Sequence, residues 1–248
     1  MVAIKPLPNL RTRLLASLLG FLTLTGLLLL PAFPSQAAVI VLDPGHGGND
    51  SGADRGNKFA EKQFTLALAQ KIAALLEARH RVELTRTADV QMAPADRAAV
   101  ANHLGADLMI SLHAAVAPYC SDRTAAVYYH IDERLKIPFG SSSKGMPTEL
   151  DADQPAWNQL QIQHQHQSQH LATTLKQSLG DSDTFDSISV SGIPLVPLMG
   201  ADLPAVLVEV GCLHPAASTD PQTLKQQLDW FAASLANAIE TALPGLVP

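Results

Sequence analysis

The sequence predicts a single α/β domain built on a mainly parallel, twisted sheet of about six strands, with helices on both faces. Short runs of β-branched and apolar residues alternate with longer segments of helical periodicity, as in proteins that wind helices around a parallel sheet. The chain has 248 residues, of which 47% are hydrophobic, so it can fill one sizeable core. We expect residues 38–248 to form this domain.

Residues 1–37 predict a secretory signal peptide. Three basic residues precede an uncharged, leucine-rich run at 14–30, and a small-residue pattern follows, ending at Ala37. This order is typical of a leader that is cleaved, here after Ala37 or Ala38. An uncleaved anchor is the alternative, because about 20 apolar residues span a bilayer and this run is slightly shorter. We expect a periplasmic or secreted protein of the cell envelope.

The charge pattern argues against nucleic acid as a partner. The formal net charge is −6 at pH 7, and no basic stripe interleaved with aromatic residues runs through the sequence. Phosphate-driven binding needs such clustered cations, so we expect no nucleic-acid interaction. We expect contact with the membrane only through the leader before its cleavage, and a monomeric protein.

The elements of the first half follow one another in the order that this fold class requires. They are a strand at 39–43, a helix at 59–79, a strand at 81–86, a helix at 94–104 and a strand at 107–113. The first helix is amphipathic, with Phe64, Leu68 and Ile72 close to helical spacing. The last strand is apolar until it reaches His113.

The second half resumes the pattern after an interruption. Its elements are a strand at 125–131, a helix at 157–179, one or two strands within 188–198, a buried strand at 203–210 and a helix at 221–243. The stretch 136–155 has no apolar period and carries Ser, Gly and Pro before an acidic cluster around Asp151, so it predicts a surface insertion. It is either a passive loop or a lid that inhibits the site.

Two cysteines, Cys120 and Cys212, lie a few residues beyond His113 and Glu209. Export permits a disulfide, which would join two neighbouring strand-end loops. Two unpaired thiols are an equal alternative. A nucleophilic role for Cys212 is disfavoured, since no activating base lies near it in the sequence.

Four polar residues stand where ligands bind in an open α/β sheet, at the carboxyl ends of strands. His46 follows the first strand on a glycine-rich turn, His113 ends the third, and Glu209 lies near the end of the last, while Glu61 opens the first helix. Two imidazoles and one carboxylate, with water in the fourth position, make one type of catalytic zinc site. The remaining carboxylate, Glu209, would then act as general base.

Each of these residues also has a structural interpretation. A lone histidine is more often a hydrogen-bonded structural residue, and Glu61 could be a first-turn glutamate favoured by the helix dipole. Glu209 is harder to explain this way, because a carboxylate inside the apolar run 204–210 is costly to bury without a metal, a proton or a partner. The joint placement of all four residues favours a metal site.

Several spaced motifs carry a resemblance to a known family. They are DPGHGGNDSGA at 43–53, EK at 61–62, TR at 85–86, Arg97 with Ala101 and Asn102, ADLMISLHA at 106–114 and LPAVLVEVG at 203–211. In this order they resemble the zinc-dependent N-acetylmuramoyl-L-alanine amidases of the bacterial cell wall. The resemblance covers most of the chain after the leader and is weakest in the middle.

The resemblance implies a zinc ion bound by His46, Glu61 and His113, with Glu209 as the catalytic carboxylate. The implied substrate is peptidoglycan, cut at the amide between the lactyl group of N-acetylmuramic acid and L-alanine. Glu209 would take a proton from water and return it to the leaving amine. A regulatory protein is a further possible partner.

The glycines that flank His46 would let the backbone turn tightly beside the metal; they are Gly45, Gly47 and Gly48. Asp43 is expected either to cap this turn or to orient His46.

The chain departs from the family pattern beside two of these residues. It reads AlaAlaVal at 114–116, where the family usually has an asparagine, and CysLeuHisPro at 212–215, in place of a phenylalanine-rich stretch. These departures concern the substrate groove and leave the metal set intact. Two other functions stay open: another exported zinc peptidase, or a non-catalytic cell-wall-binding regulator that keeps the fold. Glu209 argues against the second.

Overall fold

The computed structural model describes residues 37–53, 60–115, 123–132, 157–182, 184–212 and 221–246, all within one compact unit, Ala37–Pro248. The predicted leader, Cys120 and the insertion at 136–155 lie outside these residues, as does the side chain of Cys212. Within the described ranges, no helix is long and apolar enough to cross a membrane.

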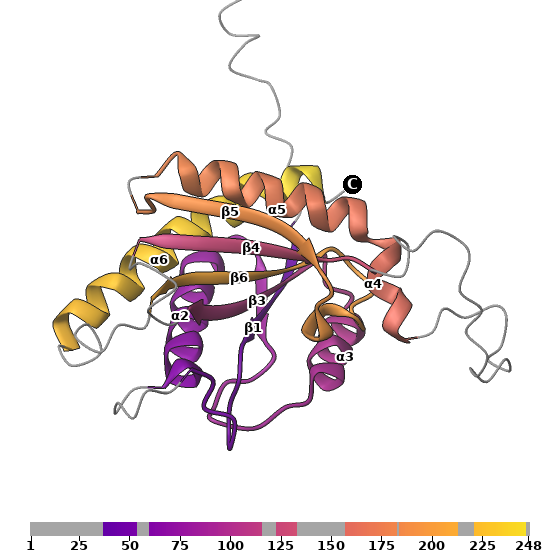
Figure 1. The fold of residues 1–248 in the computed structure, drawn as a ribbon, viewed down its shortest axis with the longest axis horizontal. Helices are drawn as coiled ribbons and strands as arrows, with labels where there is room; N and C mark the ends of the chain where they lie inside the picture. Colours follow the sequence, from indigo (N-terminus) through magenta and orange to yellow (C-terminus); the bar gives the residue numbers. More distant parts are fainter. Residues whose placement is uncertain are drawn as a thin grey trace, which may run out of the picture. The chain divides into compact units, whose positions relative to one another are not determined.

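A twisted sheet of six strands forms the centre of the described part of the chain, in the order β2-β1-β3-β6-β4-β5 (Figure 1). The strands are β1 (Val39–Pro44), β2 (Arg81–Leu84), β3 (Leu108–Ala115), β4 (Thr124–His130), β5 (Ser187–Ile193) and β6 (Ala205–Cys212). Neighbouring strands are parallel except β4 and β6, which run antiparallel. The predicted mainly parallel sheet is confirmed.

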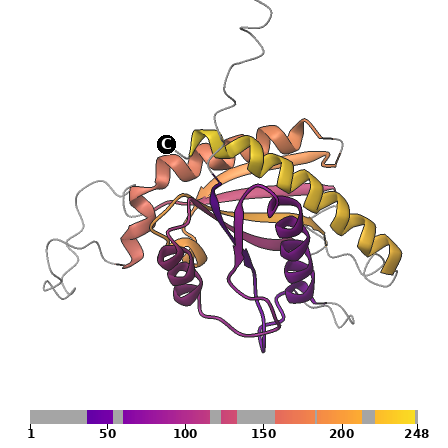
Figure 2. The ribbon, with the colours of Figure 1, turned by 180° about the vertical axis from the view of Figure 1, so that it is seen from behind.

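Helices lie on both faces of this sheet, as predicted, but unequally (Figures 1 and 2). α2 (Glu61–Leu76), α5 (Gln165–Gly180) and α6 (Pro221–Ala242) pack on one face, against inward-pointing residues such as Ile110 and Val208. α3 (Pro94–Leu104) and the short 3₁₀ turn η3 (Val196–Leu198) pack on the other face, against Val41, Met109 and Leu207. Alternate residues of the central strands β1, β3 and β6 therefore enter two separate cores.

The continuous helix predicted at 157–179 is wrong in detail. The segment contains a 3₁₀ turn η2 (Trp157–Gln159), a short helix α4 (Leu160–Gln163) and then α5, with a break at His164. At the break the buried side chain of Gln161 donates to the carbonyls of Ala201 and Leu203, at 2.9 Å each, and accepts from the Ser168 hydroxyl. These long-range bonds outweigh local helix propensity.

The predicted strand region at 188–198 also ends early, at Ile193. The chain then turns, with the Leu195 N–H donating to Nδ1 of buried His130 at 2.9 Å, before η3 begins. Pro194, which directly follows the strand, has no N–H to supply to a further ladder. The remaining predicted elements are present, with bounds that shift by a few residues.

Candidate metal centre

Three of the four predicted site residues converge at the carboxyl ends of β1 and β3. His46 follows β1, His113 lies within β3, and Glu61 is the first residue of α2. Their candidate ligand atoms all lie within 4.8 Å of one another, and no other such group of His, Cys, Asp or Glu occurs among the described residues. Residues separated by up to 67 positions in sequence are thus assembled into one cluster, because the parallel strands end at the same edge.

Glu61 is the centre of this cluster. Its Oε1 atom lies 3.1 Å from Nε2 of His46 and 3.0 Å from Nδ1 of His113. The backbone N–H of Ala114 also donates to Oε1, at 3.0 Å, and that of Ala53 donates to Oε2 at 2.8 Å. Burial alone would raise the pKa of Glu61, but the hydrogen bonds from the two histidines and from Ala53 hold it well below its usual range. The carboxylate is therefore charged although it is buried.

The two imidazoles meet edge to face. Their ring centroids are 4.8 Å apart and their planes are inclined by 81°. Burial would lower the pKa of His46, but hydrogen bonds and charge attraction from Glu61 and Asp50 outweigh it, so this pKa is raised. Two imidazole nitrogens and one buried, charged carboxylate around a common point are a donor set that fits zinc.

The turn that carries His46 is held by two buried arginines. His46 has φ = 63°, a left-handed conformation that is uncommon outside glycine. Arg86 donates to the carbonyls of Pro44 at 2.9 Å and Gly45 at 2.8 Å, and Arg97 donates to those of Pro44 and His46, at 2.7 Å each. Three consecutive carbonyls are thus fixed by guanidinium groups, which offsets the strain at His46.

The expectation that Asp43 caps the turn or orients His46 directly is wrong. Its carboxylate is buried and accepts from Arg97 at 2.7 Å, Thr85 at 2.6 Å and Ser111 at 2.7 Å. All three donors lie outside the turn that carries His46: Arg97 in α3, Ser111 in β3 and Thr85 just after β2. Asp43 therefore acts on His46 indirectly. It neutralises and orients Arg97, and the other terminal nitrogen of Arg97 donates to the His46 carbonyl.

Asp50 contacts the other nitrogen of the His46 ring, a partner that was not predicted from the sequence. Its Oδ2 atom lies 2.9 Å from Nδ1 of His46, and its Oδ1 accepts from the Gly52 N–H at 3.0 Å. A carboxylate bonded to the far nitrogen of a ligand histidine fixes the ring and leaves Nε2 free to face a metal. The available signal was an acidic residue four positions after a histidine on a glycine-rich turn.

The glycines of this region allow close packing around the cluster. A Cβ atom on Gly45 would come within 2.5 Å of the His113 ring, and one on Gly52 within 2.5 Å of the His46 ring. Gly47 and Gly48, with φ = 128° and 61°, adopt conformations that favour glycine. The predicted tight, glycine-dependent turn beside the candidate metal is confirmed.

Glu209 lies beside the cluster and not within it. In the sheet it is paired in register with His113 across β3 and β6, and it faces the same side as Leu207. It is half-buried, and burial, together with the negative charge of Glu61, raises its pKa. The Tyr128 hydroxyl donates to its Oε2 at 3.4 Å. This placement suits a carboxylate that serves a neighbouring metal without binding it.

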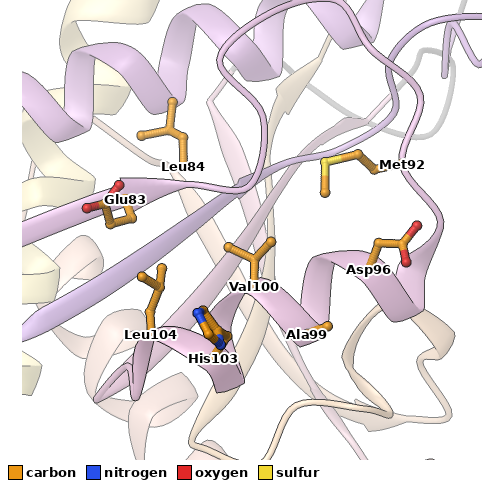
Figure 3. Close-up of a pocket in the computed structure, with 8 residues that line it drawn as sticks. All are labelled: Glu83, Leu84, Met92, Asp96, Ala99, Val100, His103 and Leu104. Carbon is orange, nitrogen blue, oxygen red and sulfur yellow. The ribbon is translucent and has the colours of Figure 1, made fainter.

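A pocket of about 500 Å³ lies elsewhere, between β2 and α3 (Figure 3). It is lined by Glu83, Leu84, Met92, Asp96, Ala99, Val100, His103 and Leu104. None of the four site residues contributes to it. The ionisable side chains of the candidate site converge at the strand ends and not in this pocket.

Comparison with known proteins agrees with this geometry. Residues 40–241 match the family model described as N-acetylmuramoyl-L-alanine amidase. AmiC of Escherichia coli O6:H1 is 28% identical over 187 residues, which cover 69% of this chain and 44% of AmiC. AmiA of Escherichia coli K12 is 44% identical over 78 residues, 31% of this chain and 27% of AmiA. The chain thus spans less than half the length of these curated relatives.

Solved structures show the same fold. AmiC2 of Nostoc punctiforme aligns with a TM-score of 0.60 at 22% identity, covering 84% of this chain and 97% of that one. Ami1 of Mycobacterium smegmatis aligns with a TM-score of 0.59 at 20% identity, with the same coverage of each chain. Since the family model spans most of the sequence, the chain belongs to the N-acetylmuramoyl-L-alanine amidase family.

Proposed function

We propose that this protein is an exported, zinc-dependent amidase that hydrolyses the bond between N-acetylmuramic acid and L-alanine in peptidoglycan. One observation carries the proposal: His46, Glu61 and His113 converge within 4.8 Å, and Glu209 lies in register beside His113. The names of the relatives support the substrate, and the leader pattern at 1–37 supports export.

His46, Glu61 and His113 would hold the zinc, which when bound supplies a Lewis acid for the amide carbonyl and for a water molecule. Hydrogen bonds fix two of the three ligands before any metal arrives: Asp50 holds the His46 ring, and the N–H groups of Ala53 and Ala114 hold Glu61. Such preorganisation lowers the ordering cost of binding.

Glu209 then moves the proton. Its carboxylate accepts a proton from the attacking water and returns it to the nitrogen of the leaving L-alanine, so that the amine departs neutral. Burial favours this exchange, because it raises the pKa of Glu209 toward neutral pH. A group whose pKa lies near the working pH both accepts and returns a proton readily.

The protein would work in the periplasm or outside the cell as a monomer, with peptidoglycan as its main partner. A regulatory protein is a further candidate, because one structural relative, CwlD of Clostridioides difficile (TM-score 0.58), was solved in complex with the GerS lipoprotein.

Mass spectrometry of peptidoglycan incubated with the zinc-loaded protein tests the proposal. We expect release of stem peptides that begin with L-alanine, leaving glycan strands without peptides. Glu209→Ala should retain zinc but lower the release rate by about 10² to 10⁴-fold. Glu83→Ala, which removes an exposed carboxylate on β2, is the matched control and should leave the rate unchanged.

Other products would point to other functions. Cleavage within the stem peptide would identify a different zinc peptidase. One bound zinc per chain without hydrolysis of any muropeptide would identify a non-catalytic wall-binding protein. Undiminished release by Glu209→Ala would remove this residue from the mechanism.

A further inference from the structure

Two adjacent tyrosines of β4 face opposite sides of the sheet. Tyr129 packs against the large core beneath α2, α5 and α6, whereas Tyr128 packs beside the smaller core on the α3 face. Alternation along a strand requires this separation. Only Tyr128 therefore shares a face with Glu209.

The register of the sheet brings Tyr128 to Glu209. Tyr128 lies opposite Leu207 in β6, so Glu209, two residues further along, is its diagonal neighbour. The tyrosine oxygen lies 3.4 Å from Oε2 of Glu209. Hydrogen bonds at catalytic sites are often long in the free enzyme and tighten when substrate is bound.

Glu209 is thus flanked on both sides. His113, its register partner on β3, belongs to the metal cluster, and Tyr128 on β4 stands on the opposite side. A carboxylate has two oxygens, and only one is needed to accept and return a proton. A donor on the other oxygen would set the rotation of the group about its last side-chain bond.

We propose that Tyr128 is a positioning residue for Glu209: its hydroxyl donates to Oε2 and turns Oε1 toward the reacting water and the leaving amine. The inference rests on the proposed function of Glu209. The tyrosine keeps its own proton throughout, and the transferred proton passes from water to Oε1 and from Oε1 to the amine nitrogen.

The surroundings keep Tyr128 in the donor form. Burial, and then the negative charge of Glu209, raise the pKa of Tyr128 above its usual value. A neutral phenol donates one hydrogen bond, and its oxygen lies 3.4 Å from Oε2 of Glu209.

Tyr128→Phe tests the inference, and Tyr129→Phe on the opposite face is the matched control. Both variants keep the ring and lose one hydroxyl. With zinc-loaded full chain and purified muropeptide, we expect Tyr128→Phe to lower kcat about tenfold, the size of a hydrogen bond to a charged group. KM, zinc content and the thermal unfolding midpoint should stay near wild type, and Tyr129→Phe should keep wild-type kcat.

Three results would overturn the inference. The first is an unchanged kcat in Tyr128→Phe. The second is an equal loss of kcat in Tyr129→Phe, and the third is a loss of activity that zinc content or unfolding explains. If Glu209→Ala is inactive while Tyr128→Phe is fully active, positioning by Tyr128 fails and the proposed function stands. If the wild-type protein releases no stem peptide, both fail.

Discussion

The two faces of the central sheet differ in composition and in role. The face beneath α2, α5 and α6 is apolar from β1 to β5 and contains the larger core. The α3 face has a smaller core, and the same strands place Asp43, Ser111, His113 and Glu209 there. One face thus supplies burial energy, while the other positions charge.

This difference shows how one sheet can hold strained and charged groups. Buried Asp43, Arg86 and Arg97 and the left-handed His46 would each be costly if alone. Arg97 donates to Asp43 and to the His46 carbonyl, and Arg86 donates to the carbonyls of Pro44, Gly45 and Lys62. The apolar face contributes the stability that the site does not. Four pairs of variants test this difference between the two faces.

The largest effect is expected from Asp43→Ala compared with Leu175→Ala. Asp43→Ala leaves Arg97 buried without its carboxylate, so the free energy of unfolding should fall by about 3–5 kcal/mol. Zinc affinity should fall too, because Arg97 holds the His46 carbonyl. Leu175→Ala in the large core should cost about 2–5 kcal/mol but leave the zinc affinity of the folded protein unchanged. Urea unfolding measures the stability of both variants, and zinc competition measures their zinc affinity. Equal zinc affinities in the two variants would contradict the proposed difference between the faces.

The next effect concerns the His46 ring. Asp50→Asn removes the negative charge at Nδ1 with little change in volume, and zinc affinity should fall about 10- to 100-fold. Asp229→Asn removes a carboxylate paired with Lys71 on the far helices and should leave zinc affinity unchanged. Competition with a chromogenic chelator gives both values. Equal affinities in the two variants would deny Asp50 its supporting role.

A smaller effect distinguishes the ends of two helices. Gly105, which ends α3, has φ = 59°, and Gly180, which ends α5, does not have a positive φ; a Cβ on either would meet no atom within 4 Å. Gly105→Ala should therefore destabilise by about 1–2 kcal/mol, whereas Gly180→Ala should stabilise by about 0.4–1 kcal/mol. Thermal unfolding shows the sign of each change, and shifts in the same direction would contradict the backbone argument.

The smallest effect is a pH dependence away from the metal cluster. Burial lowers the pKa of His130, whose Nδ1 accepts the Leu195 N–H, although the charge of Asp132 partly opposes this. A folded-state pKa below the unfolded value means that the neutral ring stabilises the fold. This contribution is present above about pH 6.5 and is lost as the pH falls through that value toward the folded pKa.

His130→Asn keeps an acceptor near the Nδ1 position but does not titrate. Between pH 7.5 and 5.5 it should lose less unfolding free energy than the wild type does. His103→Asn, which changes an exposed histidine of α3, should retain the wild-type loss. Identical pH dependence in all three proteins would remove His130 as the titrating group.

Local pattern was enough to predict much of the fold. Hydrophobic periodicity located all six strands and the long helices, because burial of alternate or helically spaced residues is written directly into the chain. It failed at His164, where bonds from Gln161 to the distant residues Ala201 and Leu203 interrupt the helix. Contacts between distant residues leave no local periodicity to detect.

Sequence motifs alone were enough to predict the candidate site: they singled out His46, Glu61 and His113, which the structure gathers into one cluster, and the proposed base Glu209 beside them. Strand ends and turn residues are recognisable from short stretches of sequence, so these positions could be predicted without knowing the fold. The residues that support this site could be identified only from the folded structure. Asp50 on the His46 ring, the Asp43–Arg97 pair behind the turn and Tyr128 beside Glu209 depend on strand register and on which face each side chain takes. Strand register and the facing of each side chain are established only when the strands pair and the sheet packs against its two cores.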